Sequence, residues 1–578
     1  MVYRIADNVL SPLGFTTAAN YQALMEGRSS LRRHASFSGR RDDDYVASQF
    51  TAAQRSQLMV EGLTWFESLA YRSIITALSD SGVDVTTSRT LLILSTTKGN
   101  IDHLSSAGPD TLLPAQSAWR IAALLGVSTQ PVVVCNACVS GVSAIVTAQR
   151  LLETRCYDTA IVAGCDVVSH FVVSGFQSLK ALSAAPCRPF DIERAGLNLG
   201  EAAATLILAN DSCIQVHDSG QNQAATLRDS RWQIVSGALR NDACHISSPS
   251  PQGEACCSAI RYVTQGIDLQ TLGAVNAHGT ATLYNDQMES VALWQAGLSA
   301  VPLVALKGYF GHTLGASGLL ETILTMHSAD QGQLPATHGY YTSGVSCRVN
   351  IAACPQPVGH PSFVKIISGF GGVSAALYCR RGSAASRPPR PVDCQVAHSV
   401  RITPLSATVD GRPLPLSSRG NQLLADIYHH YVGTYPRYHK MDCLSQLGFL
   451  ASELLSAQEQ PRQDHCSHRA VVLFNHTSSL STDREYARTI VPGVDYYPSP
   501  SLYVYTLPNI VCGEIALRHG YHGETSFYMM GFRDEEMMRD IVRSAFCDTT
   551  LQSILTGWVD YSDATTFEAE VKLINRKE

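Results

Sequence analysis

The sequence has 578 residues, with 45% hydrophobic and 16% charged side chains, which is the composition of a globular protein with a sizeable core. Its 43 basic and 49 acidic residues give a net charge of −6, so the charge balance does not favour nucleic acid or a membrane surface as partner. At roughly 100–200 residues per domain, this length predicts more than one compact unit.

The 17 cysteines are scattered and show no repeated metal-ligand spacing, so we expect neither a metal site nor a disulfide framework. Reduced thiols are typical of a cytoplasmic protein. The N-terminus lacks a basic segment followed by an apolar core, and no uncharged apolar run reaches about 18 residues. We therefore expect no signal peptide and no membrane span.

Apolar strands alternate with amphipathic helices through the first region of the chain. Helical periodicity covers residues 63–78 and 115–125, and buried strands are predicted at 90–95, 132–134 and 159–163. This alternation predicts an α/β fold with helices packed on mostly parallel sheets.

One predicted strand delivers a cysteine to the start of a helix. The apolar run 132–134 leads into Asn136-Ala137-Cys138, and helical spacing begins at Val142. A thiol at a helix N-terminus has a lowered pKa and can act as a nucleophile. The alternative is that Cys138 is a small buried hydrophobic residue, as most free cysteines are.

Two later strands end in polar, glycine-rich segments that each carry one histidine. His278 lies in residues 275–282, and His312 lies in residues 306–316 together with Lys307. Two such histidines and a helix-start cysteine predict a Cys/His site. A further strand ends in a glycine turn at 368–372, whose N–H groups can complete an oxyanion hole.

A small-residue, basic and proline-rich stretch follows at 382–391 and predicts a linker. It divides the chain into residues 1–385, a linker at 386–393, and residues 394–578.

These motifs together resemble the β-ketoacyl synthases, the condensing enzymes of fatty-acid and polyketide synthesis. The matching segments follow the family order and are the cysteine loop 136–141, Arg188–Asp191 with Gly200-Glu201, His278–Thr282 with Asn285-Asp286, Lys307 with 311–316, and Gly369–Gly372.

The resemblance implies a thiolase-like fold of α-β-α-β-α layers for residues 1–385. Its two related halves, at about 1–240 and 241–385, each hold a mixed five-stranded sheet. It also implies a homodimer, or a heterodimer with a ketosynthase-like chain, formed partly through strand 132–134. The implied partner is an acyl carrier protein, which supplies the phosphopantetheine, so no cofactor of the chain's own is expected.

The resemblance further implies an acyltransferase that performs a decarboxylative Claisen condensation. Cys138 holds an acyl group as a thioester, and the carbanion from a malonyl-carrier attacks it. His278 and His312 stabilise the enolate as neutral hydrogen-bond donors. Lys307 acts electrostatically through Glu201 and the two histidine loops.

Further residues take supporting roles in this interpretation. Backbone N–H groups of Cys138 and of the Phe370-Gly371 turn form the oxyanion hole, and Phe370 gates access to the thiol. Thr280, Thr282 and Asp286 support the first histidine loop.

The loop 96–100 departs from the usual sequence and resembles that of synthases for aryl polyene and flexirubin-type pigments. Lys98 in this loop is expected to be an exposed lysine. If it faces the pocket instead, it touches a substrate or the carrier phosphate.

Residues 394–578 repeat the N-terminal part of the synthase sequence. The offset is 394 between Gly126 and Gly520 and 393 between Gly164 and Gly557, so chance similarity is excluded as the explanation. The nucleophile position there carries Met530, Gly531 or Phe532. This predicts a non-catalytic half-domain that covers a face, docks a partner or acts like a chain-length factor.

Three other interpretations stay open at this point. A non-catalytic partner subunit or scaffold usually lacks the nucleophile, whereas this chain keeps Cys138. A thiolase needs a second cysteine near the glycine turn, and Cys379 lies beyond it. A chalcone-synthase arrangement places an asparagine where this chain has His312. If residues 394–578 are only accessory, a protein ending near residue 390 should keep its thiol chemistry.

Overall fold

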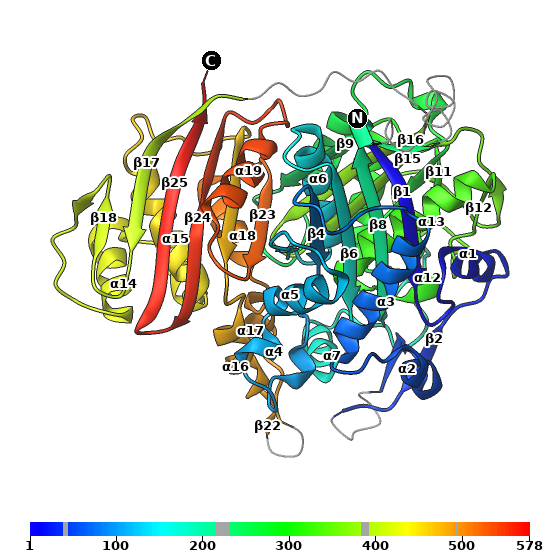
Figure 1. Cartoon of the computed structure of the whole chain (residues 1–578), viewed down its shortest axis with the longest axis horizontal. Helices are drawn as coiled ribbons and strands as arrows, with labels where there is room; N and C mark the ends of the chain where they lie inside the picture. Colours follow the sequence, from blue (N-terminus) through cyan, green and yellow to red (C-terminus); the bar gives the residue numbers. More distant parts are fainter. Residues whose placement is uncertain (38–43, 214–230, 383–391, 492–494, 578) are drawn as a thin grey trace.

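The computed structural model describes residues 1–37, 44–213, 231–382, 392–491 and 495–577 (Figure 1). Most of the predicted linker, residues 386–391, lies outside the described residues.

The first half of the synthase region forms a mixed five-stranded sheet. Its order is β1 (Val2–Leu10), β8 (Ala202–Asn210), β6 (Thr159–Asp166), β4 (Thr90–Ser95) and β5 (Val132–Val134). The last three strands are parallel, and β8 runs antiparallel to both of its neighbours. Strands β4, β5, β6 and β8 are buried throughout, which explains why their sequences are apolar without alternation.

The second half repeats this order and direction in its own sheet. The strands are β9 (Trp232–Asn241), β16 (Val373–Arg381), β15 (Ser362–Gly369), β10 (Ala274–Asn276) and β11 (Pro302–Val304). The predicted thiolase-like fold with two mixed five-stranded sheets is therefore confirmed. The predicted boundary near residue 240 is wrong, because β9 pairs along its length with β16 and so belongs to the second half.

Two central helices, α6 (Ser140–Glu153) and α13 (Ser317–Asp330), are almost entirely buried. They approach closely because both carry glycine at the contact: a Cβ on Gly141 would lie 2.8 Å from the backbone N of Leu319. Helices α3 (Trp65–Ser79) and α5 (Pro114–Leu125) pack on the first sheet, and α10 (Glu254–Val263) packs on the second. The predicted helices at 63–78 and 115–125 thus begin and end within two residues of α3 and α5.

Shorter elements complete the synthase region. They are α1 (Thr17–Met25), β2 (Leu31–His34), β3 (Tyr45–Ser48), α2 (Ala52–Leu58), η2 (Ile101–His103), α4 (Pro109–Leu112), α7 (His170–Ser178), β7 (Leu199–Gly200), η3 (Leu269–Thr271), α11 (Leu283–Gln295), α12 (Lys307–Phe310), η4 (Leu314–Ala316), β12 (Gln333–Leu334), β13 (Asn350–Ile351) and β14 (Gln356–Pro357).

The C-terminal region, yellow to red in Figure 1, builds the same sheet a third time. Its order is β17 (Cys394–Ile402), β25 (Thr566–Arg576), β24 (Ser553–Asp563), β20 (Arg469–Asn475) and β23 (Thr525–Met530). Helices α15 (Cys443–Ser456) and α18 (Ile510–His519) pack together against one face, and α19 (Glu535–Ala545) packs against α6 on the other. We call residues 392–577 the half-domain, because they correspond to one half of the synthase.

The remaining elements of the half-domain are short. They are β18 (Ala407–Val409), β19 (Arg412–Pro413), α14 (Asn421–Ile427), η5 (Tyr428–Val432), η6 (Pro436–Lys440), α16 (Leu480–Ala487), β21 (Ile490–Val491), β22 (Asp495–Tyr496) and α17 (Pro500–Tyr505).

One face of the half-domain sheet carries charged side chains that are partly exposed to solvent. In β25, buried apolar residues alternate with partly exposed charged ones, whereas all nine residues of β8 are buried. Ion pairs cover this face, including Arg533 with Glu570 at 3.0 Å and Arg401 with Glu568 at 2.9 Å. In the half-domain, the part of this face formed by β17 and β25 is thus charged and partly exposed.

The half-domain joins the synthase region edge to edge. Strand β23 pairs antiparallel with β5, with Met530, Met529 and Tyr528 opposite the three valines of β5, and this pairing makes one continuous ten-stranded sheet. The prediction that strand 132–134 pairs with a second chain in a dimer is therefore wrong. The edge that would bind a second chain already binds this chain's own repeat, and the repeat uses the strand that corresponds to β5.

Two buried ion pairs cross the same junction. Arg150 of α6 pairs with Glu524 at 2.5 Å, and Arg240 of β9 pairs with Asp548 at 2.6 Å. These four side chains are at most 6% exposed, so each charge depends on its partner across the junction. The half-domain is an integral part of the folded chain, and the expectation that a protein ending near residue 390 keeps its thiol chemistry loses its structural basis.

No helix in the ranges that the structure describes is long and apolar enough to cross a membrane.

The Arg150–Glu524 pair gives a test of this junction. Replacing Glu524 by Gln removes the carboxylate that binds the buried guanidinium, and breaking a buried pair in this way costs about 3–5 kcal/mol. We expect urea denaturation of E524Q to shift to clearly lower concentration. E568Q removes one partner of an exposed pair on the open face and should shift it little; equal shifts in the two variants would contradict the interpretation.

The occupied β5 edge also predicts the oligomeric state. Sedimentation velocity should find the mass of a single chain at micromolar concentration, since β23 leaves no free edge at β5 for a second copy. A stable dimer would show that another surface mediates self-association.

Candidate active site

Cys138 lies in a tight turn between β5 and α6. The preceding residue, Ala137, adopts a left-handed backbone conformation with φ of 48°, which is strained for a residue with a side chain. Strained residues of this kind cluster at functional sites. Helix α6 begins at Ser140, so the thiol precedes the helix by two residues.

The two predicted histidines meet at this cysteine. His278 follows β10 and His312 follows α12, and their rings lie 5.1 Å apart at nearly right angles. The Cys138 Sγ and one ring nitrogen of each histidine all lie within 4.8 Å of one another. The structure thus assembles residues that are 140 and 174 positions apart into one cluster.

Each histidine has an unpaired ring nitrogen. The His312 Nδ1 accepts a hydrogen bond from the N–H of Leu314 at 3.3 Å, so in the neutral ring the proton lies on Nε2. This Nε2 and the His278 Nδ1 are buried and have no partner among the described residues. Both rings are thus held beside the thiol with capacity to bind a ligand.

A cavity of about 390 Å³ adjoins the cluster. Cys138, Thr280, Thr282 and Phe370 line it together with both histidines, and the Cys138 side chain is 9% exposed. This volume lies within the range of small-molecule sites in proteins.

Burial keeps both histidines neutral. Desolvation lowers the pKa of His278 and of His312 well below the usual value, and the charges of Lys307 and Lys365 add to this effect. A neutral imidazole can donate one hydrogen bond and accept another near pH 7.

Burial acts in the opposite direction on the thiol. It raises the pKa of Cys138 to about 12, and the charge of Lys307 opposes this only in part. The predicted lowering of the pKa is therefore wrong for the resting state, because the thiol is buried and lies outside the first turn of α6. The resting site holds a protonated thiol beside two neutral imidazoles.

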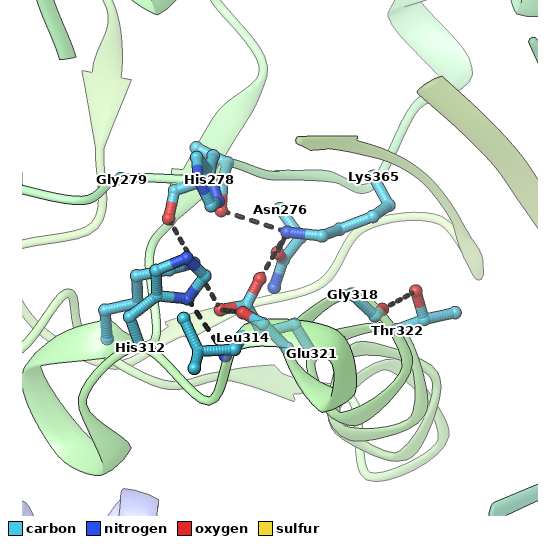
Figure 2. Close-up of polar contacts among 12 residues, drawn as sticks. Asn276, His278, Gly279, His312, Leu314, Gly318, Glu321, Thr322 and Lys365 are labelled. Carbon is cyan, nitrogen blue, oxygen red and sulfur yellow. Dashed lines mark hydrogen bonds and ion pairs between the residues drawn. The ribbon is translucent and has the colours of Figure 1, made fainter. Parts of the chain in front are cut away.

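Behind the histidines, two buried lysines share one carboxylate. Figure 2 shows one of them, Lys365, beside this carboxylate of Glu321. Lys307 donates to the backbone oxygen of His278 at 2.7 Å and to Glu321 at 2.8 Å. Lys365 donates to Asn276 at 2.7 Å and also binds Glu321. Burial would raise the pKa of Glu321, but the two lysines outweigh it and hold the pKa below the usual range.

The predicted link between Lys307 and Glu201 is wrong. Glu201 is fully buried elsewhere, where it accepts hydrogen bonds from the N–H of Phe50 at 2.7 Å and from Arg55 at 3.0 Å. Glu201 therefore supports the loop that follows β3, while Glu321 is the partner of Lys307.

The other predicted supporting residues lie at two kinds of position, in the cavity wall and behind it. The hydroxyls of Thr280 and Thr282 lie 2.9 Å apart in the cavity wall. Asp286 lies behind the wall and accepts from the N–H groups of Phe190 at 2.7 Å and Ala281 at 3.2 Å. It therefore ties the loop around residue 190 to the first histidine loop.

The glycine turn reaches Cys138 as predicted, but Gly371 does not serve the oxyanion hole. A Cβ on Gly369 would lie 3.2 Å from the Cys138 N, so glycine leaves space beside that N–H. The Gly371 N–H is already engaged, because it donates to the Ile246 carbonyl at 2.7 Å.

Lys98 is neither exposed nor in the cavity wall that contains Cys138, so both expectations for it are wrong. It is 7% exposed, and its ammonium group binds Asp483 of the half-domain at 2.7 Å and the carbonyl of Thr506. Its ammonium also lies 5.2 Å from the centre of the Phe171 ring. The loop 96–100 is thus part of the junction with the half-domain.

Four buried ionic residues of the site were missed in the sequence. They are Lys365, Glu321, Glu289 and Asp166. Glu289 accepts from the N–H of His278 at 2.7 Å, and Asp166 accepts from the N–H of Gly315 at 2.7 Å. The available signal was a charged residue within an apolar strand or helix, as at Lys365 in β15.

Cys138, His278 and His312 are also ligand types for zinc. The buried ammonium groups of Lys307 and Lys365 lie directly behind the histidines, and their positive charge opposes binding of a cation here.

Comparison with known proteins places this geometry in a family. The sequence profile of the beta-ketoacyl synthase N-terminal domain matches residues 5–212, and that of the C-terminal domain matches residues 233–341. Together they span more than half of the chain. The gap between them coincides with the boundary that the structure places before β9.

Named relatives share part of their length with this chain. A 3-oxoacyl-[acyl-carrier-protein] synthase 2 of Mycobacterium leprae is 29% identical over 42% of this chain and 58% of its own length. Nodulation protein E of a Rhizobium species is 26% identical over 52% of this chain and 73% of its own length. The chain thus spans less than two thirds of the Mycobacterium protein.

Solved structures share the fold. The PfaC keto synthase-chain length factor aligns over 100% of this chain and 78% of its own, with a TM-score of 0.75 and 14% identity. The ketosynthase ApeO of Xenorhabdus doucetiae, in complex with its chain length factor ApeC, aligns over 66% and 98%, with a TM-score of 0.55 and 23% identity. With both synthase domains matched in order and their motif residues gathered in one cavity, the chain belongs to the beta-ketoacyl synthase family.

Proposed function

We propose that this chain is a β-ketoacyl-[acyl carrier protein] synthase that extends an acyl group held on Cys138. The observation that carries the proposal is the convergence of the thiol and two neutral histidines within 4.8 Å at a cavity of about 390 Å³. The non-catalytic alternative is not favoured, because the nucleophile, both histidines and the lysine network are all present.

In the loading step, the Cys138 sulfur attacks the thioester carbonyl of an acyl carrier protein. The thiol has a raised pKa, so its proton must leave as the bond forms, and the neutral ring of His278 is the nearest base, because the Nε2 of His312 already carries a proton. The carbon–sulfur bond to the carrier breaks, and the departing carrier thiolate takes up the proton. We assign the stabilisation of the oxyanion to the N–H of Cys138, beside which Gly369 leaves space.

In the condensation step, a malonyl thioester occupies the same cavity. Its carbon–carboxylate bond breaks, carbon dioxide leaves, and the electron pair forms an enolate whose oxygen accepts hydrogen bonds from His278 and His312. The enolate carbon attacks the acyl carbonyl, and the bond to Cys138 breaks. The thiolate is then protonated, which restores the resting site.

Lys307 and Lys365 serve this chemistry without touching the reacting atoms. Their positive charges disfavour protonation of the histidines and so preserve the donor form. Glu321 neutralises part of the charge and fixes both ammonium groups.

The proposed partner is an acyl carrier protein that brings its own phosphopantetheine. The half-domain takes the position in the sheet that a second ketosynthase-like chain would occupy, so we propose an internal counterpart of a chain-length factor. Assignment to the aryl polyene branch rests on loop 96–100 and stays a prediction.

Acyl loading tests the proposal directly. After incubation with a panel of acyl carrier thioesters, intact mass should show one acyl group on the wild type and none on C138A. The absence of any acyl adduct on the wild type, or an adduct on C138A, would refute the proposed role of Cys138.

The histidines separate loading from condensation. H312A should still become acylated, but its condensation with malonyl-carrier should fall by about 100-fold or more, because one enolate donor is lost. Product release from pre-acylated protein, followed by mass, measures this step. Unchanged condensation in H312A would remove the histidine from the mechanism.

The raised thiol pKa gives a pH prediction that needs no carrier protein. Alkylation of Cys138 by iodoacetamide should rise about tenfold per pH unit from pH 7 to pH 10 without a plateau, because the thiolate fraction keeps growing below a pKa of about 12. The site is followed by peptide fragmentation, with exposed Cys354 in the same digest as a control for the reagent. A plateau near pH 8 would indicate a lowered pKa.

A further inference from the structure

The half-domain reaches the glycine turn at the active site. This turn joins β15 to β16 and carries Phe370, which is half-buried in the wall of the cavity that contains Cys138. Its outer side is covered by residues 503–513 of α17 and α18, more than 130 positions later in the chain.

Asn509 binds the turn through its backbone. This residue precedes α18, is 3% exposed, and donates from Nδ2 to the Phe370 carbonyl at 2.9 Å. Its Oδ1 is buried and has no partner among the described residues. The Phe370 carbonyl is thus the partner of this side-chain amide among the described residues.

The peptide unit between Phe370 and Gly371 is hydrogen-bonded at its carbonyl and at its N–H. Asn509 binds the Phe370 carbonyl, while the adjoining Gly371 N–H donates to Ile246 at 2.7 Å. The next carbonyl, that of Gly371, accepts from Asn241 at 2.7 Å, and the Asn241 amide also contacts Thr525 of the half-domain at 3.1 Å. The backbone at residues 370–371 therefore has one defined position.

Helix α18 lies directly against the turn because it carries glycine there. A Cβ on Gly513 would lie 2.7 Å from the carbonyl oxygen of Gly371 and 2.8 Å from its Cα. No residue larger than glycine fits at position 513 without displacing the turn.

The half-domain also supports the side chain of Phe370, through one intervening ring. It stacks on Phe176 of α7, with ring centres 6.2 Å apart, and the Phe176 ring meets Tyr503 of α17 edge to face at 5.7 Å. Tyr503 fits closely against α7, since a Cβ on Gly175 would overlap its ring at 2.1 Å. Ring and backbone of Phe370 thus both depend on the half-domain.

We propose that residues 503–513 of the half-domain position Phe370 as the gate to Cys138, with Asn509 as the positioning residue that holds the gate closed. This inference rests on the proposed function, in which an acyl group must pass Phe370 to reach the thiol. It assigns the half-domain a direct role in substrate access that extends beyond the pairing of β23 with β5.

Thiol accessibility tests the gate. The Asn509→Ala and Asn509→Asp variants both lose the donor to Phe370, and loss of one hydrogen bond of ordinary net strength shifts an open–closed equilibrium about fivefold. Alkylation of Cys138 at a fixed pH by a bulky maleimide should accelerate by about that factor. Iodoacetamide, which is smaller, should gain less, because a gate acts by size.

Asn475 provides the matched control. It is a buried asparagine of the same half-domain that donates to the Ser478 carbonyl at 2.9 Å and does not contact the turn. N475A should lower thermal stability as N509A does, yet leave the alkylation of Cys138 unchanged. Equal acceleration in the two variants, or none in N509A, would overturn the proposal.

Gly513→Ala is a second test of the same gate. It keeps the proposal testable if the asparagine variants misfold. Alanine favours a helix over glycine, so α18 itself should gain stability while the new methyl group displaces Gly371. We expect faster maleimide reaction at Cys138; an unchanged rate would count against the proposal.

These assays are independent of condensation. If the wild type fails to take an acyl group from any carrier, the proposed function fails while the alkylation ratios still decide whether the half-domain gates the thiol. If acyl loading succeeds and the ratios do not change, only the gate is refuted.

Discussion

The pairing of β23 with β5 is the interaction on which the rest of this structure depends. It joins two copies of the same five-stranded sheet into one sheet of ten strands, with the buried ion pairs of Arg150 and Arg240 beside it. An exposed edge strand next to the nucleophile would be open to pairing with other chains. In this protein the edge is closed intramolecularly, and the active-site cysteine follows directly on the strand that is paired.

The catalytic chemistry depends on a second constraint, the burial of several charges in one layer. Lys307, Lys365 and Glu321 lie behind the two histidines, where their electrostatic interactions are weakly screened. Desolvation, aided by the positive charges of the two lysines, keeps His278 and His312 neutral. The same burial keeps the Cys138 thiol protonated at rest. Burial is therefore the common cause of the neutral, hydrogen-bond-donating histidines and of the protonated thiol.

The half-domain takes part both in the pairing of the sheets and in the burial of charged groups. Its outer sheet face carries ion pairs in place of the apolar surface that a second half would need. Its inner side contributes β23 to the sheet, Asp483 to Lys98, and Asn509 to the turn of Phe370. A structural repeat without a nucleophile thus packs against the turn that lines the cavity of the nucleophile in the other copy.

The sequence by itself determined the family, the thiolase-like layers that it implies, the loops that carry Cys138, His278 and His312, the repeat at 394–578, and the loss of the cysteine in that repeat. These follow from local patterns, because the loops sit at the ends of apolar strands and parallel strands bring such ends together. Only the tertiary structure decided the charge partners and the thiol pKa. Lys98 and Asp483 are 385 positions apart, and burial depends on what packs around a residue rather than on its neighbours in the chain.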